Sequence, residues 1–399
     1  MQQTLERKLT LTDATFFEVG GIIGAGVFVL IGLATGMSGP AIVLAVALAG
    51  FVSFVTALSY AEISSAIPAE GGEYEYAYRL VSPAAGNAVG LGWLAADITS
   101  SAVVSIGFAS YFTAVFPQVP TKIAACGAVA LVTTLNLLGV KLSARANNVI
   151  STVKIAVLAF FIVFALAHFN PSNFSPLAPK GVAGITSAAA LFFFAFSGFG
   201  KITRLSEEVR DAERTLPKSI IAALALCTLL YIMTAVALVG AVGWASASST
   251  NSPLASALAQ LGAPGPALVV TAGALAATFS VLLTNNAGIS RIIFAFGRRH
   301  KKAASLSELH SWFKTPWKAV LLAGAATTAI VSFVEMQGIA TIASFLFLVY
   351  YAAINSIAIA ARGRENWKPR FRTPFFPLFP VLGIISCALL LAGLVLSTQ

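Results

Sequence analysis

The chain has 399 residues, of which 58% are hydrophobic and only 10% charged, and its mean hydropathy is +0.87. Soluble globular proteins carry about 25% charged residues, so this composition excludes an ordinary soluble domain. The net charge of +10 would fit a nucleic-acid ligand only if the basic residues formed one patch.

Apolar segments of membrane-spanning length recur along the whole chain. A transmembrane helix needs about 20 mainly apolar residues, and about eleven segments meet this requirement. They cover residues 12–35, 39–66, 84–116, 121–138, 147–168, 182–202, 216–242, 265–296, 317–334, 337–361 and 377–396. The sequence therefore predicts an all-α, multi-pass membrane protein.

The basic residues alternate from one side of these segments to the other. With the N-terminus inside, the outer loops hold only Lys122 and Lys180, while the inner loops 297–316 and 362–376 are rich in lysine and arginine. This asymmetry places the N-terminus in the cytoplasm of the cell and, because the span count is odd, the C-terminus outside the membrane. It accounts for the basic charge without nucleic acid. Membrane lipid is the expected partner, and nothing indicates an obligate protein partner.

The sequence contains no pattern typical of a metal site, a disulfide framework or a nucleotide-binding site. The cysteines Cys126, Cys227 and Cys387 lie in apolar stretches at spacings that fit neither a disulfide framework nor a metal site. There is also no phosphate-binding Walker loop and no catalytic triad pattern. We therefore expect neither an enzyme nor a bound cofactor.

The first ten predicted spans form two sets of five. Span starts in the second set follow those in the first by roughly 170 to 196 residues, and an odd number of spans per set gives the sets opposite orientations in the membrane. The sequence thus predicts one five-helix repeat in residues 1–168, an inverted repeat in 169–361 and a peripheral helix in 362–399. Spans of similar length can produce such offsets by chance, so the spacing alone does not establish the repeat.

Glycine clusters interrupt the first span of each set. The first span contains Gly20, Gly21, Gly24 and Gly26, and the sixth contains Gly198 and Gly200. Each glycine weakens a helix by about 1 kcal/mol relative to alanine, and unwound backbone is tolerated in a membrane only where it lines a polar cavity. Free N–H groups at one break attract a carboxylate and free C=O groups attract an ammonium, so a zwitterionic amino acid fits both. Small-residue helix packing remains the alternative for these glycines.

The residues around these breaks resemble the amino acid–polyamine–organocation superfamily of transporters. The resemblance rests on the first-span glycine cluster with Val27-Phe28, on Ser59-Tyr60-Ala61-Glu62-Ile63 with the following Glu70-Gly71-Gly72, and on Leu216-Pro217-Lys218. It implies a LeuT-type fold, a five-plus-five inverted repeat, and secondary transport of amino acids. This chain departs from many members by having Gly200 where they have an acidic residue, and by its count of eleven rather than twelve helices.

The resemblance also implies a substrate site at the two breaks. The substrate carboxylate would meet the N–H groups of Ala25 and Gly26, beside Gly24, and its ammonium would meet the carbonyls near Ile22, Phe194 and Ser197. Either Phe194 or Phe196 would form an aromatic lid. The small side chains of Ala25, Ala195 and Ser197 favour small or medium neutral amino acids.

Lys154 is the candidate for ion coupling. It lies about 10 Å along the fifth span from its inner end, and an ionisable residue within the membrane is a functional candidate by default. Burial disfavours the charged ammonium, so this side chain would exchange a proton near neutral pH. By position it resembles the lysine of the sodium-independent, proton-coupled members, which implies the Gly20 carbonyl and the Ser280 hydroxyl as its partners. Snorkelling to the inner headgroups is the alternative.

Four further acidic or basic residues lie within the predicted spans or near their inner ends. Glu18 and Lys201 flank the two breaks on the inner side and form a candidate gate, although each can also pair with other inner charges. Asp97, deep in the third span, is either a second proton site or a helix–helix hydrogen-bond partner. Glu62, near the inner end of the second span, is expected to anchor a loop rather than to contact the substrate.

These observations predict an amino-acid importer driven by protons, with alternating access. One proton moving down about 100 mV supplies about 2.3 kcal/mol, and one pH unit adds about 1.4 kcal/mol, enough for accumulation of several-hundred-fold. An amino-acid exchanger or a sodium-coupled symporter of the same fold remains an alternative, and a non-concentrating receptor or channel is a more distant one.

Overall fold

The computed structural model describes residues 7–69, 72–139, 143–299, 301–365 and 367–396. Within these ranges the chain is helical, with one isolated bridge between Leu9 and Val209 and no strand. The motif residues Glu70–Gly71 and the C-terminal residues 397–399, which were expected outside the membrane, lie outside the described residues.

The helices follow the predicted apolar segments closely. In chain order they are α1 (Leu11–Ile22), π-helical η1 (Gly26–Leu30), α2 (Ile31–Ser38), η2 (Gly39–Ala41), α3 (Ile42–Ala66), α4 (Glu73–Leu80), α5 (Pro83–Val115), α6 (Thr121–Leu137), α7 (Ala144–Leu166), η3 (Pro171–Phe174), α8 (Gly181–Phe192), η4 (Phe193–Phe196), η5 (Lys201–Glu208), α9 (Ala212–Ser248), α10 (Pro253–Gln260), α11 (Pro264–Arg299), η6 (Lys301–Ser307), α12 (Trp317–Phe333), α13 (Met336–Arg362) and α14 (Leu378–Leu396).

Several helix starts are fixed by local sequence. Thr10 and Asp13 form a capping box at the start of α1, in which each side chain accepts a hydrogen bond from the backbone N–H of the other residue. Ser82 caps α5 and is followed by Pro83 at the first helical position, and Ser143 caps α7. These polar residues satisfy backbone donors that have no partner inside the helix.

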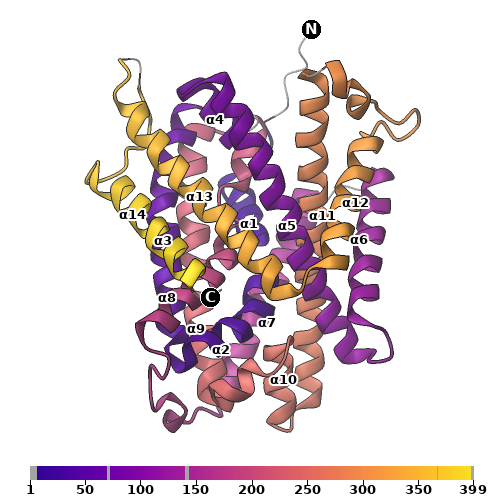
Figure 1. Ribbon diagram of the computed structural model, residues 1–399, viewed down its shortest axis with the longest axis vertical. Coiled ribbons are helices and arrows are strands. Elements are labelled where there is room, and N and C mark those ends of the chain that lie inside the picture. Colours follow the sequence, from indigo (N-terminus) through magenta and orange to yellow (C-terminus); the bar gives the residue numbers. More distant parts are fainter. Residues whose placement is uncertain (1–6, 70–71, 140–142, 300, 366, 397–399) are drawn as a thin grey trace.

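In the part of the chain that the structure describes, eight helical stretches are long and apolar enough to cross a membrane, and α6 and α12 are shorter apolar helices. One of the eight, Leu11–Ala66, contains 56 residues and includes everything from α1 to α3. The helices run broadly along one long axis (Figure 1). The protein is thus a multi-helix membrane protein.

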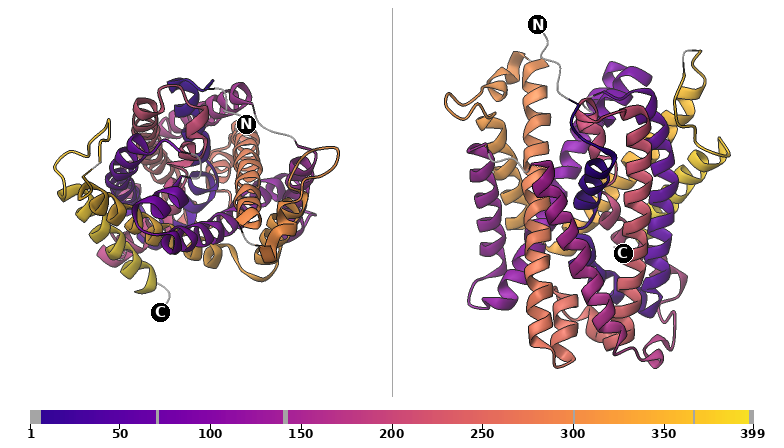
Figure 2. Two further views of the ribbon diagram at one scale, coloured as in Figure 1. Left: turned by 90° about the horizontal axis from the view of Figure 1, so that it is seen from above. Right: turned by 180° about the vertical axis from the view of Figure 1, so that it is seen from behind.

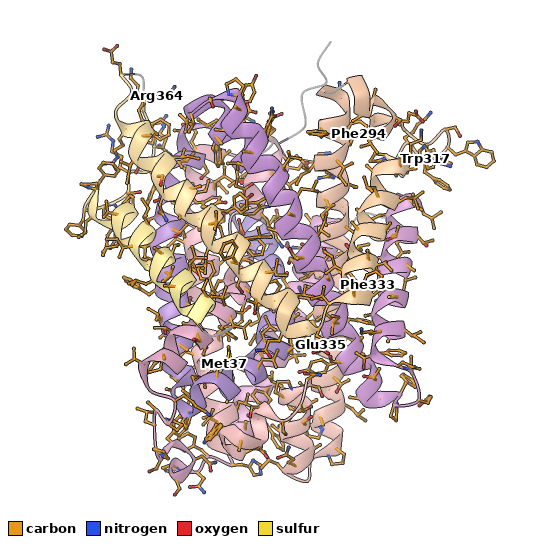
Figure 3. All side chains as sticks on the ribbon, in the orientation of Figure 1. Met37, Phe294, Trp317, Phe333, Glu335 and Arg364 are labelled. Carbon is orange, nitrogen blue, oxygen red and sulfur yellow. The ribbon has the colours of Figure 1, made fainter. Side chains whose placement is uncertain are left out.

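One end of the bundle gathers the segments predicted to face the cytoplasm. The chain's N-terminal end, α4 and the connection from α11 to α12 lie at the top of Figure 1, whereas α10 lies at the bottom. Figure 3 places Arg364 and Phe294 toward the same upper end and Met37 in the lower half of the bundle. We call the upper end the basic end.

The packing centres on α1, α3, α5, α8, α9 and α11. Helix α1 packs against α9 and α7, α3 packs against α9 and α8, and α5 packs against α11 and α13. Helix α14 lies on the flank, against α13, α3 and α8 (Figures 1 and 2). The N-terminal arm also joins the second half of the chain, because Lys8 and Leu9 donate N–H bonds of 2.9 Å to the Glu208 carbonyl and Arg210 donates one to Leu9.

Candidate functional site

The first helix is interrupted at the predicted glycine cluster. Helix α1 ends at Ile22, and Ile23 adopts an extended backbone conformation with φ −75° and ψ 103°. Helical structure resumes as the π-helical turn η1 at Gly26, and both sides of the break are buried. A helix end leaves its terminal N–H and C=O groups without partners in the helix, so peptide dipoles are available here.

The second interruption lies between α8 and η5. Helix α8 ends at Phe192, the 3₁₀ turn η4 continues to Phe196, and the chain then turns through residues 197–200 before η5 begins. Gly200 has φ +85°, in the left-handed region that favours glycine. Both breaks predicted from glycine content are therefore present.

The two breaks touch through backbone atoms. A Cβ placed on Gly26 would lie 2.4 Å from the Cα of Ala195, and one placed on Gly198 would lie 2.2 Å from the carbonyl oxygen of Gly21. Such distances are far below van der Waals contact, so neither position has room for a side chain. Gly26 and Gly198 therefore allow the two breaks to approach closely, in addition to weakening the helices at these points.

Two tyrosines donate to carbonyl groups of the candidate substrate site. The Tyr231 hydroxyl, on α9, donates to the Ile22 carbonyl at 2.9 Å and lies 3.4 Å from the Ala195 carbonyl. The Tyr351 hydroxyl, on α13, donates to the Ser197 carbonyl at 3.1 Å. Each carbonyl has a second lone pair, so these bonds leave capacity for an ammonium. Sequence reasoning missed both tyrosines, although a hydroxyl in an apolar span signals a buried hydrogen-bond partner.

The aromatic residues expected to cover the substrate are buried. Phe196 is fully buried and its ring centroid lies 5.2 Å from that of Tyr231, whereas Phe194 faces Phe347 at 6.3 Å. Gly24 packs against Val281, and Ala25 packs against Gly107 of α5. The residues named for the substrate thus come together at the two breaks.

Lys154 contacts the first break directly. Its side chain is 1% exposed, and its Nζ donates a 2.7 Å hydrogen bond to the Gly20 carbonyl. The Ser280 hydroxyl, the other expected partner, donates to the Ala277 carbonyl of its own helix at 2.9 Å. Among the described residues no carboxylate forms an ion pair with Lys154, so its partner is a peptide dipole rather than a charge.

The two residues of the candidate gate have separate partners in this conformation. Glu18 Oε1 accepts hydrogen bonds from the backbone N–H groups of Gly200 and Ile202, each at 3.1 Å. Lys201 Nζ donates to Asn285 Oδ1 on α11 at 2.9 Å. Glu18 therefore places a carboxyl group beside Gly200, from a different helix than the one expected to carry an acid there.

An ionic network lies between these residues and the basic end. Arg204 is 3.0 Å from Asp97 and 3.7 Å from Glu73, and its guanidinium lies 5.1 Å from the centre of the Trp93 ring. Tyr60 donates to Glu73 at 2.9 Å. Asp97 thus acts as a side-chain partner between α5 and η5, which was one of the two alternatives left open by the sequence.

Glu62 holds the connection that leads to α14. Its carboxylate accepts hydrogen bonds from Arg362 at 2.7 and 2.9 Å, from Trp367 at 3.1 Å and from the Thr373 N–H at 2.8 Å. Arg362 is the last residue of α13, and Trp367 and Thr373 belong to the segment that follows it. This is the loop anchor expected from the sequence.

A cavity of about 310 Å³ leads from the basic end to the first break. Its lining includes Gly20, Gly21, Lys201, Ser280 and Asn285, together with Asp13 and Arg291 nearer the surface. Ala25, Gly26, Phe194 and Ser197 are not part of this lining. The cavity therefore reaches the lysine-bound side of the break from the basic end.

Comparison with known proteins matches residues 13–398 to the family model described as amino acid permease. The chain belongs to the amino acid permease family. This finding confirms the resemblance to the amino acid–polyamine–organocation superfamily, which is a superfamily of transporters.

Relatives of this permease include proteins with different named substrates. It is 30% identical to the branched-chain amino acid permease BcaP of Bacillus subtilis, over 98% of this chain and 89% of that protein. It is 31% identical to the methylthioribose transporter of the same organism, over 96% and 88% of the two chains. It is also 29% identical to the vacuolar cationic amino acid transporter 4 of Arabidopsis thaliana, over 90% of this chain and 64% of that one.

Proposed function

We propose that this permease imports amino acids by proton symport with alternating access. The observation that carries the proposal is the meeting of two interrupted helices, one from each half of the chain, with the ammonium of Lys154 bound to the first break at 2.7 Å. Exposed N–H and C=O groups at the breaks can bind the carboxylate and the ammonium of a zwitterion, and a buried amine can bind and release a proton.

The architecture we propose is the LeuT-type five-plus-five inverted repeat. Its support is the symmetry of the helix contacts when α1 is exchanged with α8, α3 with α9, α5 with α11, α6 with α12 and α7 with α13. Under this exchange α1–α9 corresponds to α3–α8, α5–α13 to α11–α7, and α5–α6 to α11–α12, and each of these pairs packs together. The short helices α4 and α10 also follow α3 and α9 at equivalent places.

The membrane topology follows from this repeat. Residues 1–168 and 169–361 form the two repeats, and 362–399 adds a peripheral helix, so that the chain crosses about eleven times. The N-terminus faces the cytoplasm and the C-terminus the outside, because the basic loops gather at the end where α1 begins. The 310 Å³ cavity then opens to the cytoplasm, as in an inward-facing conformation.

The proposed substrates are small or medium neutral amino acids. Backbone groups of Ala25, Gly26, Ile22 and Ser197 would bind the carboxylate and the ammonium that all amino acids share. The side chains of Ala25, Ala195 and Ser197 beside them are small and carry no charge, which suits a neutral substrate. The similarity to a branched-chain amino acid permease agrees with an apolar substrate side chain. The similarity to a cationic amino acid transporter makes cationic amino acids the competing substrate class.

Lys154 would couple transport to protons through its bond to Gly20. A charged ammonium donates to the Gly20 carbonyl and holds the inner half of the first helix against α7. When the amine releases its proton it loses charge, and the charge-assisted bond, which is stronger than a neutral one, weakens. The inner half of the helix is then freer to move, which links the proton to access from the cytoplasm.

Uptake into proteoliposomes tests the proposal. A panel of labelled amino acids is offered under an imposed pH gradient, with and without sodium, to the native protein and to Lys154→Ala. The expected result is sodium-independent accumulation that requires the pH gradient and is lost in Lys154→Ala. Sodium dependence, or pH-driven accumulation that persists in the variant, would reject proton coupling through Lys154.

A further inference from the structure

Four acidic side chains in the described part of the chain are almost fully buried. Glu18 and Glu62 are 0% exposed, Asp97 is 1% exposed and Glu73 is 2% exposed. Three of the four have an arginine counter-ion, since Glu62 lies 2.7 Å from Arg362, and Asp97 and Glu73 lie 3.0 and 3.7 Å from Arg204. Within the described ranges Glu18 forms no ion pair.

The two oxygens of Glu18 have unequal surroundings. Oε1 accepts both backbone N–H bonds, from Gly200 and Ile202, whereas Oε2 is buried with no hydrogen-bond partner among the described residues. An ionised carboxylate spreads its charge over both oxygens, and a buried charge that lacks partners is strongly unfavourable. A neutral carboxyl fits better, because its carbonyl oxygen accepts the two bonds and its proton resides on Oε2.

Charged and titratable groups approach Glu18 from several elements. Lys201 comes from the start of η5, Glu73 and Tyr76 from α4, Cys227 from α9 and Tyr351 from α13. The only cation among these five, Lys201, already donates to Asn285. On α7, Lys154 donates to Gly20, two residues further along the helix that carries Glu18.

Glu18 is separated from the cavity by its own helix. Its neighbours Phe17, Gly20 and Gly21 line the 310 Å³ cavity, as does Lys201, but Glu18 does not. The bonds from Glu18 to Gly200 and Ile202 join α1 to η5. Separation of these two segments would therefore expose the carboxyl group to the water of the cytoplasmic cavity.

We propose that Glu18 is a second proton-carrying group of this permease, distinct from Lys154. In the packed arrangement the carboxyl group is neutral, with its proton on Oε2. When α1 and η5 separate, the O–H bond breaks, the proton passes to water of the cytoplasm, and the carboxylate that remains is solvated. The role in coupling rests on the proposed proton symport, whereas the protonation itself does not.

Infrared spectroscopy tests the protonation directly. The carbonyl stretch of a protonated carboxyl group is recorded at neutral pH for the native protein, for Glu18→Gln and for Glu73→Gln. Glu73→Gln is the matched control, because Glu73 is equally buried but has an arginine, and Arg204 keeps Asp97 when Glu73 is replaced. We expect the signal to be lost in Glu18→Gln and retained in Glu73→Gln.

A second variant covers the case in which Glu18→Gln does not fold. Glu18→Asp keeps a carboxyl group on a shorter side chain, so the signal should change its frequency or intensity rather than remain as in the native protein. Spectra that are identical for the native protein and either Glu18 variant would overturn the proposal. Loss of the signal in Glu73→Gln but not in Glu18→Gln would also overturn it, since the proton would then reside on Glu73.

The coupling role has its own measurement. The number of protons moved per amino acid is determined in proteoliposomes. Glu18→Gln should lower it by about half, because one of the two proposed proton-carrying groups is then permanently neutral. An unchanged ratio would refute the coupling role. If the native protein moved no protons, the proposed function would fail, and the infrared signal would still decide whether Glu18 is protonated.

Discussion

Substitution of Gly26 by alanine tests whether the two breaks touch as described. The added Cβ would lie 2.4 Å from both the Cα and the Cβ of Ala195, and the Cα belongs to the backbone, which cannot rotate away. The two breaks would have to separate by about 1 Å or more to reach ordinary contact, since carbon atoms pack at about 3.5–4.0 Å. Overpacking of this kind costs about 1–3 kcal/mol.

The assay is thermal unfolding of the purified protein, followed by counterflow of a labelled amino acid in proteoliposomes. At about 2–4 °C per kcal/mol for domains of 150–250 residues, and less for longer chains, Gly26→Ala should lower the melting temperature by a few degrees. The rate of counterflow should fall even at temperatures where the variant remains folded, because the displaced backbone is the proposed substrate site.

Gly127→Ala is the matched control for this substitution. A Cβ on Gly127, in α6, would have no heavy atom within 4 Å, so the change should be neutral or should stabilise the helix by up to about 1 kcal/mol. A Gly26→Ala protein with the melting temperature and counterflow of the native protein would refute the close approach of the two breaks.

Three other substitutions test the contacts around the breaks. Tyr231→Phe removes the donor to the Ile22 carbonyl and should cost about 1–3 kcal/mol, measured as a lower melting temperature, with weaker substrate binding; unchanged binding would exclude this carbonyl from the site. A double-mutant cycle on Glu18→Gln and Lys201→Gln should give a coupling in the free energy of unfolding below about 0.5 kcal/mol, because the two side chains form no ion pair here and the proposed Glu18 carboxyl is neutral; a larger coupling would mean that they pair with each other. Glu62→Gln should destabilise the protein by up to about 3–5 kcal/mol, less the part that Arg362, whose side chain is 24% exposed, recovers from solvent; a melting temperature equal to the native value would contradict the anchor.

The positions of the helices could be predicted from the sequence because hydropathy and glycine content act locally. Helix α5 begins one residue before the start of the predicted segment. The break after Ile22 lies among the glycines from which it was predicted. The short helices α4 and α10 were not predicted, since eight residues without a long apolar run leave no membrane signal.

The partners of the buried polar residues could not be predicted in the same way. Asp97 and Arg204 are 107 residues apart, and Glu62 and Arg362 are 300 residues apart, so their pairing depends on how the helices pack. Gly200 stands where many members of the superfamily have an acidic residue, so the sequence indicated that no carboxyl group lies there. In the structure Glu18, 182 residues earlier in the chain, accepts a hydrogen bond from the Gly200 N–H. A list of residue types along the chain does not contain that information.

The short backbone pairing between the N-terminal arm and the segment after η5 has a practical consequence. Three amides, those of Lys8, Leu9 and Arg210, are held in this pairing near the start of α1 and outside both breaks. Their exchange with deuterium would therefore report the opening of α1 without any label or mutation near the transported molecule. Fusion partners attached immediately before Leu9 would disturb that pairing, which makes the opposite terminus the safer place for an affinity tag.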